Sequence, residues 1–332
     1  MFRGGESILH VIRRWILPVV AAAAACSAPA FAQKYPEKPI RLIVPYPPGG
    51  NIDITARTIS PGLSGMLGTS VVVDNRAGAS GTIGVDLVAK SPPDGYTLVV
   101  GSTGTITGAP SVVPRLPYDP IRDLVGISTI TDVPLVIVVH PAMRARNMKE
   151  LVALAKRKPG SMTFGSAGPG TTNHLAGELF QIATGVKFTH IPYKGSGPAL
   201  IELMGGQIDV VFDQLTASIG YIRGGKLRAI GVTAPKSSAQ VPDVPTLAEQ
   251  GCKGCEASTF TGLFAVTGTP KAIIDRLASA TAKVVASKPV EERFASLGAE
   301  AKSSTPDYLA RFVRDDIARW RRVVKEAGIK LE

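Results

Sequence analysis

The feature that most constrains this chain is an order of segments that occurs twice: strand, glycine-rich turn, helix, strand. The first copy starts with "IRLIV" and the turn "PYPPGGNID", and its helix-like run ends at Gly68. The second starts with "MTFGSAGPG", and its helix-like run ends at Gly185. Alternating strands and helices predict an α/β fold with mainly parallel sheets. A long unit that occurs only twice predicts two similar lobes and not a solenoid.

Two extended segments, "VGISTITDVPLVIVVHP" and "EASTFTGLFAVTGTP", are suited to connect such lobes. A chain of 332 residues exceeds one comfortable hydrophobic core, which also favours two lobes. Two crossings make a hinge, and a cleft between hinged lobes is typical of a receptor that closes on its ligand. We expect residues 33–133 and 260–332 to form lobe 1 and residues 134–259 to form lobe 2.

Residues 1–32 have the composition of an export signal. Three arginines precede the apolar run Trp15–Ala25, and a small-x-small cleavage site ends at Ala32. We therefore predict a periplasmic protein cleaved after Ala32. A membrane anchor is the alternative, but a span needs about 18 or more apolar residues. Lipid attachment at Cys26 stays open, although Ala23 stands where a larger aliphatic residue is usual.

Cys252 and Cys255 would be the cysteines of the exported chain. Their C-x-x-C spacing predicts a disulfide in an oxidising compartment. A redox site would place the motif at the start of a helix, whereas here glycines flank it and a strand-like run follows. Zinc would need two further ligands, and no partner pair is visible. We predict a disulfide and no metal.

The formal net charge of +11 raises the question of a nucleic-acid partner. Export argues against it, and the positive charge is dispersed except in "RWRRVVK". We predict a monomer that binds no nucleic acid.

The two glycine-rich turns are the candidate binding elements. In open α/β sheets, ligands lie beyond the carboxyl ends of the strands, where free N–H groups and helix dipoles favour an anion. Glycines let a ligand approach the backbone, prolines stiffen the first turn, and Tyr46 can supply a wall and a hydroxyl. The second turn, "GSAGPGTTNH", offers N–H and hydroxyl donors. Facing each other, the turns could hold a carboxylate without arginine; alternatively both are ordinary strand-to-helix turns.

Enzyme signatures are missing. The second turn lacks the lysine of a P-loop, and neither G-x-G-x-x-G nor G-x-S-x-G occurs. Asp53, Asp209 and Asp213 could be paired carboxylates for acid–base work. Asp53 in a first helical turn is more simply dipole-compensating, whereas Asp213, at a strand's carboxyl end, is the favoured cleft residue. It could accept a hydrogen bond from a ligand amine or hydroxyl. We predict no enzyme and no cofactor.

Several longer motifs occur in order: "YPEKPIRLIVPYPPGGNIDITAR", "VVVDNRAGASGTIG", "GSAGPGTTNHLAGELF", "HIPYKGSGPALIELMGGQIDVVFD" and "VPDVPTLAEQG". With them, nearly the whole exported chain resembles the Bug-type periplasmic substrate-binding receptors of tripartite tricarboxylate transporters. The resemblance implies a type II periplasmic-binding-protein fold, two α/β lobes with a ligand cleft between them. It also implies capture of a small carboxylate, or a related amide, for membrane permease subunits.

Carried over by position, the resemblance implies these ligand-binding residues: Tyr46, Gly49, Gly50, Asn51, Asp53, Ser102, Thr103, Ser166, Gly170, Thr171, Thr172, Asn173, His174, Tyr193, Lys194 and Asp213. Tyr46 stands where phenylalanine is common, and Asn51 occupies a variable position that could tune specificity. The cysteine pair is unusual for the family.

Two alternative functions stay open at this point: a ligand sensor for a membrane signalling kinase, and a periplasmic enzyme that acts on carboxylates. A partner would identify the first, and an assay for turnover the second. The sequence does not name the solute. Since neither turn contains lysine or arginine, we predict that neutral donors hold the main carboxylate and that Lys194 is peripheral.

Overall fold

The computed structural model describes residues 35–326. The chain divides into a short unit, residues 1–37, and a unit of residues 38–332 that contains every helix and strand of the described residues. The export signal predicted for residues 1–32 lies outside the described residues.

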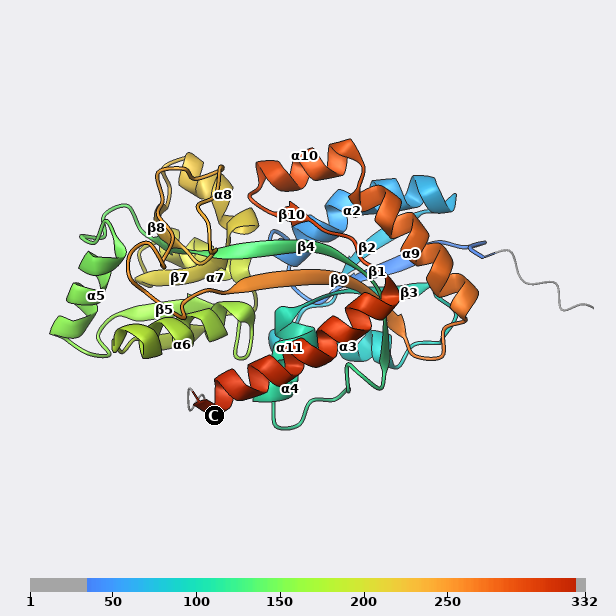
Figure 1. Ribbon diagram of the computed structural model, residues 1–332, viewed down its shortest axis with the longest axis horizontal. Coiled ribbons are helices and arrows are strands. Elements are labelled where there is room, and N and C mark those ends of the chain that lie inside the picture. The colour runs from blue at the N-terminus through green and yellow to red at the C-terminus, as the bar shows by residue number, and fades with distance from the viewer. Residues whose placement is uncertain (1–34, 327–332) are drawn as a thin grey trace, which may run out of the picture. The chain divides into compact units, whose positions relative to one another are not determined.

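A 10-stranded sheet runs through the larger unit (Figure 1). Eight strands follow the order β2-β1-β3-β9-β4-β7-β5-β6, and β8 and β10 both pair with β4. The strands are β1 Ile40–Val44, β2 Val71–Asn75, β3 Thr97–Ser102, β4 Leu124–Val139, β5 Thr163–Ser166, β6 Thr189–Pro192, β7 Val210–Gln214, β8 Arg228–Val232, β9 Ser258–Val266 and β10 Glu300–Ala301.

The two ends of the sheet are parallel and its middle is antiparallel. β1 pairs in parallel with β2 and β3, and β5 pairs in parallel with β6 and β7. Between them, β9 is antiparallel to β3 and β4, and β4 is antiparallel to β7 and β8. We call the side with β1, β2 and β3 the first lobe and the side with β5, β6 and β7 the second lobe. The predicted α/β fold with two lobes is confirmed.

β4 and β9 run side by side from one lobe to the other (Figure 1). Residues 124–134 of β4 pair with β9, and residues 135–139 pair with β7 in the second lobe. The partner of β4 changes between Pro134, which faces Ser258, and Leu135, which faces Gln214. These strands are the two crossings that the sequence predicted, and they position both lobes around one cleft.

Helices cover the sheet on both sides. The first lobe carries the helices α2 Asn51–Leu67, α3 Thr82–Ala89, α4 Ala109–Val112, α9 Lys271–Val285, α10 Lys288–Ser296 and α11 Pro306–Glu326, together with the short 3-10 turn η1 Ala79–Gly81 and the π-type turn η2 Thr103–Gly108. The second lobe carries α5 Met148–Arg157, α6 Thr172–Thr184, α7 Ser196–Met204 and α8 Leu215–Arg223.

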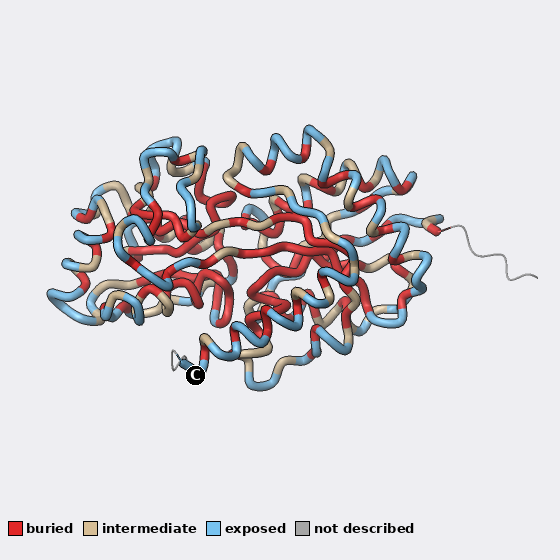
Figure 2. Tube along the Cα trace, in the orientation of Figure 1, coloured by how far each residue is buried: buried red, intermediate tan, exposed pale blue. Residues whose placement is uncertain are grey.

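The core of the second lobe shows why residues 135–139 of β4, "LVIVV", are all apolar. Successive residues of a strand point to opposite faces of the sheet. Leu135 and Ile137 pack into one core with residues of α5 and α6, whereas Val136 and Val138 pack into another with residues of α7 and α8. Figure 2 shows the resulting buried path along β4 and β9. Because both faces are covered here, this part of the strand is hydrophobic at every position instead of alternating.

The helices after the two glycine-rich turns match the sequence prediction closely. α2 buries Ile52, Ala56 and Ile59 on one face and ends at Gly68, whose φ of 73° is left-handed. α6 is capped by Thr171 and ends at Gly185 in the same conformation. Glycine reaches this conformation without the steric cost of a Cβ atom, so both stop signals have a physical basis.

Candidate functional site

The first glycine-rich turn connects β1 to α2 and is held from behind by Asp53. The Asp53 carboxylate accepts hydrogen bonds from Gly49 N, Arg57 Nε and Asn75 Nδ2, each at 3.0 Å. Asn75 Nδ2 also donates to the Tyr46 carbonyl at 2.9 Å. Burial works to raise the pKa of Asp53, but the bonds from Arg57, Gly49 and Asn75 together hold that pKa below its ordinary value. An ionised carboxylate therefore fixes the shape of this turn.

The second turn connects β5 to α6 and is held by neutral groups. Thr171 Oγ1 donates to Gly168 O at 2.7 Å and caps α6, while Gly170 N donates to His174 Nδ1 at 3.2 Å. The His174 ring stacks on that of His190 with centroids 4.2 Å apart. Burial lowers the pKa of His174 to about 3 and that of His190 to about 4. Both imidazoles are therefore neutral at pH 7, and His174 can accept the Gly170 hydrogen bond.

Ser166, at the start of this turn, pairs with His190 of the neighbouring strand β6, and the sequence motifs did not predict the pair. Ser166 Oγ is 2.7 Å from His190 Nε2. Such a pair could activate a nucleophile, but Ser166 is fully buried and its hydroxyl also contacts the backbone of Gly168. The geometry fits a serine that shapes the turn, since no substrate atom can reach Oγ without moving the turn.

The two turns meet around a small cavity of ≈ 30 Å³. Its walls are Tyr46, Gly50, Asn51, Ile52, Ser102, Gly104, Ala167, Thr171, Thr172, Asn173, Ser196, Gln214 and Thr259. The volume has room for about two water molecules. The lining contains hydroxyl and amide side chains but no lysine, arginine, aspartate or glutamate. Three helices, α2, α6 and α7, begin at this cavity, so their N-terminal N–H groups add positive potential.

A second cavity of ≈ 230 Å³ adjoins the first, because Tyr46 and Ala167 line both. Its other walls are residues 78–81, Gly168, Pro169 and residues 192–194. Within it, Ala79 and Ser80 have φ values of 45° and 55°, which are uncommon outside glycine. The Tyr46 hydroxyl donates to Ser80 O at 3.0 Å. We call the smaller space the inner cavity and this one the outer cavity.

Glycines allow the two lobes to approach across these cavities. A methyl group at Gly195 would lie 2.8 Å from Pro47 Cδ, and one at Gly168 would lie 2.6 Å from Ser80 Oγ. At Gly104 it would lie 3.2 Å from Thr171 Cα. Real Cβ atoms rarely come so close to other atoms. The structure is therefore a closed arrangement that larger residues at these positions would disturb.

The predicted ligand-binding residues fall into three groups. Tyr46, Gly50, Asn51, Ser102, Thr171, Thr172 and Asn173 line the inner cavity, and Tyr193 and Lys194 line the outer cavity. Gly49, Asp53, Ser166, Gly170, His174 and Asp213 are absent from both linings, and their contacts instead fix the shape of the turns and the cavity floor. Thr103 points elsewhere: its Oγ1 accepts from Phe260 N at 3.1 Å.

Asp213 lies behind the inner cavity. Its carboxylate is fully buried and accepts hydrogen bonds from Ser196 Oγ, Ser218 Oγ at 2.6 Å and Asn173 Nδ2 at 3.0 Å. Burial raises the pKa of Asp213 despite these bonds. Since both oxygens are engaged within the protein, Asp213 positions the cavity floor and is not placed to accept from a ligand amine.

The sequence prediction did not include Ile52, Gly104, Ala167, Ser196, Gln214 and Thr259. Ser196 could have been found, because it opens a helix after a glycine just as the two turns do. Gln214 at the end of β7 and Thr259 at the start of β9 are joined by a 3.1 Å hydrogen bond. Their approach depends on sheet register, which the sequence pattern does not specify.

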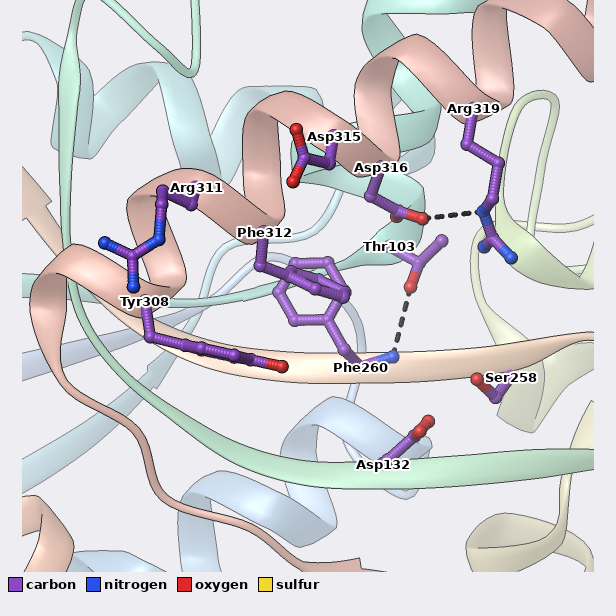
Figure 3. Close-up of a pocket in the computed structure, with 10 residues that line it drawn as sticks. All are labelled: Thr103, Asp132, Ser258, Phe260, Tyr308, Arg311, Phe312, Asp315, Asp316 and Arg319. Carbon is purple, nitrogen blue, oxygen red and sulfur yellow. Dashed lines mark hydrogen bonds and ion pairs between the residues drawn. The ribbon is translucent and has the colours of Figure 1, made fainter.

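A separate pocket of ≈ 450 Å³ lies between α11 and the crossing strands (Figure 3). It is lined by Thr103 from η2, by Asp132, Ser258 and Phe260 from β4 and β9, and by residues of α11. Arg319 Nε donates to Asp316 Oδ1 at 2.9 Å, and Asp316 Oδ2 accepts from Thr107 Oγ1 at 2.6 Å. The Thr107 bond ties α11 to η2, whereas the Arg319 bond stays within α11.

Over residues 35–326, none of the helices combines the length and the apolar character that a membrane span needs. Within the same residues, no group of three histidine, cysteine or acidic side chains is placed to hold a metal ion. Cys252 and Cys255 form a disulfide in the buried core of the second lobe, which confirms the predicted pairing.

The crossing strands, the two lobes and the paired glycine-rich turns define a periplasmic binding protein of the type II fold. More narrowly, residues 55–329 match the tripartite tricarboxylate transporter family receptor, and the chain belongs to this family. Members are periplasmic solute-binding receptors, so the Bug-type resemblance seen in the sequence is confirmed.

Three relatives illustrate this membership. BugT from Bordetella pertussis is 41% identical over 318 residues, which cover 96% of this chain and 98% of BugT. An R. palustris protein solved with adipate is 35% identical with a TM-score of 0.87, covering 89% of this chain and 99% of its own. MatC from Rhodopseudomonas palustris, solved with bound malate, is 32% identical with a TM-score of 0.84, and the match covers 87% of this chain and 100% of MatC.

Proposed function

We propose that this protein captures a small carboxylate, or a related amide, in the interlobe cleft and delivers it to the membrane permease of a tripartite tricarboxylate-type transporter. The observation that carries the proposal is the inner cavity, where three helices begin and every polar side chain is neutral. Relatives solved with adipate and with malate support the choice of carboxylates.

Neutral donors can bind a carboxylate strongly in such a place. A hydrogen bond to a charged group contributes about 1.5–3 kcal/mol, so three or four suffice without a counter-charge. The N-termini of α2 and α6 add favourable potential. One carboxylate group would occupy the inner cavity, and the rest of the solute would extend into the outer cavity beside Tyr193 and Lys194.

Binding requires the lobes to open and close, since the inner cavity holds only about two waters. We propose the lobe boundaries expected from the sequence, residues 33–133 with 260–332 and residues 134–259. The change of partners of β4 after Pro134, and the start of β9 at Ser258, support them. The strands that connect the lobes would act as the hinge.

The exported protein would be cleaved after Ala32, act as a periplasmic monomer and catalyse no reaction. The buried position of Ser166 supports the last point, because the nearest nucleophile–base pair is closed to substrate.

The test is a thermal-shift screen of purified protein against succinate, malate, adipate and citrate, with their neutral methyl esters as matched controls. A ligand at 100 times its Kd stabilises the protein by about 2.7 kcal/mol, which raises the Tm measurably. We expect at least one carboxylate to raise the Tm while its ester does not, and a smaller radius of gyration with that carboxylate in small-angle scattering. Stabilisation by esters or amines alone would contradict the proposal.

A further inference from the structure

Asn51 is the first residue of α2, and it makes a direct side-chain contact between the lobes. Thr216 Oγ1, from the start of α8 in the second lobe, donates to Asn51 Oδ1 at 2.7 Å. Both side chains are buried, with 3% exposure each. The bond joins residues 165 positions apart, and it can form only when the lobes are closed.

The other end of the Asn51 amide is unpaired. Among residues 35–326, Asn51 Nδ2 is a buried nitrogen without a hydrogen-bond partner. Asn51 also lines the inner cavity. A buried donor without a partner is costly, and native proteins rarely keep one unless a ligand or water satisfies it. Nδ2 is therefore a donor that is available to a solute in the cleft.

We propose that Asn51 determines specificity by donating from Nδ2 to an acceptor oxygen of the solute, while the Thr216 bond to its Oδ1 couples that recognition to lobe closure. The inference rests on the proposed function and deepens it. One side chain would contact the solute with one atom and the opposite lobe with the other.

The chemistry around Asn51 narrows the class of solute. The inner cavity is lined by neutral groups, and Asp213, the carboxylate behind it, is already bonded to Ser196, Ser218 and Asn173. An ammonium group would therefore lose its hydration without gaining a counter-charge. The solute we infer carries a second oxygen acceptor besides its main carboxylate and no amine: a dicarboxylate, a hydroxy acid or an oxo acid.

The experiment separates selectivity from closure. Calorimetric Kd values are measured for two matched pairs of probes, succinate against butyrate and adipate against hexanoate, and for aspartate, with wild type, Asn51→Leu and Thr216→Val. Thr58→Val is the matched control, because its hydroxyl bonds only to Ile54 O of its own helix. Asn51→Ala, which removes the Nδ2 donor without adding a charge, replaces Asn51→Leu if that variant does not fold.

We expect wild type and Thr58→Val to prefer one dicarboxylate over its monocarboxylate by at least tenfold. Asn51→Leu should remove that preference. Thr216→Val should keep the preference but weaken both probes of the pair by a similar factor of about three to ten, as expected for a lost neutral hydrogen bond.

An unchanged preference in Asn51→Leu overturns the inference and leaves the proposed function standing. So does a wild type that prefers monocarboxylates, or one that binds aspartate more tightly than succinate. If wild type binds none of the carboxylates, the proposed function itself fails, and the inference fails with it.

Discussion

The two glycine-rich turns present similar backbone donors to one cleft, yet they are stabilised by opposite means. In the first turn, prolines limit the backbone and the ionised Asp53 accepts from Gly49, Arg57 and Asn75. In the second, a threonine cap and a neutral His174 hold the backbone. The comparison shows that a preformed anion site can be supported either by a charge kept outside it or by no charge at all.

The difference also separates the turns in their response to acid. The depressed pKa of Asp53 means that its contribution is present above the unfolded value and is lost as pH falls through the folded value, below about 4. The depressed pKa values of His174 and His190 reduce stability at a higher pH than that of Asp53 does. Between about pH 6.5, the ordinary histidine pKa, and the folded pKa values of about 3 and 4, the unfolded chain binds protons that the folded protein does not. The free energy of unfolding therefore decreases as the pH is lowered through this range.

The largest expected effect is therefore an acid loss of stability that comes from the second turn. Each buried imidazole costs at most about 1.4 kcal/mol per pH unit below 6.5. Glu178, which is 3.6 Å from His174 Nε2, and Asp213 have raised pKa values, so both oppose this slope. Urea unfolding of wild type at pH 7, 6, 5 and 4.5 should show the loss.

The variant His190→Gln removes one of the two buried imidazoles and leaves Glu178 and Asp213 in place, so its change in pH dependence reports on His190. Its free energy of unfolding should depend less steeply on pH than that of wild type over the same range. Parallel profiles for the two proteins would show that the second turn is not the acid-sensitive one.

The next largest effect is expected from Asp53→Asn in the first turn. An amide would place donors against Arg57 and Asn75, so at least one hydrogen bond to a charged group is lost, at a cost of about 1.5–3 kcal/mol. Urea unfolding at pH 7 measures this cost, and the Kd for a carboxylate should rise as Gly49 loses its anchor. Arg57→Gln is the control: Arg57 is 53% exposed, so its removal should cost about 1 kcal/mol or less. If Asp53→Asn and Arg57→Gln lowered the free energy of unfolding equally, Asp53 would stabilise the protein through its ion pair with Arg57 and not by holding the turn.

Thr171→Val tests the cap of the second turn. The hydroxyl donates to Gly168 O and caps α6, and loss of such a cap costs about 1 kcal/mol, up to about 2. Because Thr171 lines the inner cavity, carboxylate affinity should weaken by about tenfold, which corresponds to 1.4 kcal/mol. Thr171→Ser keeps the hydroxyl and should recover most of both effects in calorimetry and unfolding. If Ser behaves like Val, the methyl group and not the hydroxyl is what matters.

The smallest effect is expected from Lys194→Met. Lys194 is exposed at the rim of the outer cavity, and exposed charge contacts contribute about 0–1 kcal/mol. Carboxylate Kd should change less than about fivefold, and its dependence on NaCl concentration should flatten. Loss of binding in this variant, with binding retained in Thr171→Val, would contradict a site built from neutral donors.

Much of the fold could be predicted from the sequence because its signals are local. Gly68 and Gly185 end helices through backbone conformation, and Thr171 caps one through its own hydroxyl. Burial within a helix is less local: Ile182 of α6 is an apolar residue and yet is 51% exposed. Packing of the whole lobe, and not helical spacing alone, decides which side of α6 is buried.

The candidate site was less predictable because its walls come together through tertiary structure. Asp213 lies at a strand's carboxyl end, as expected, but contacts from Ser196 and Ser218 on two other helices turn it into a support. Likewise, no sequence signal pairs Asn51 with Thr216. The turns could be identified from composition, whereas the partners of each side chain required the register of the sheet.

The crossing strands have a consequence for how such a protein can change over evolutionary time. Because β4 leaves the first lobe and β9 returns to it, the second lobe is one uninterrupted stretch of chain inserted into the first. Recombination at two points in a gene could therefore exchange half of the solute site as a cassette. A hybrid would keep the Asp53-supported turn and acquire a new second turn to face it, so new solute preferences could arise without altering the first turn.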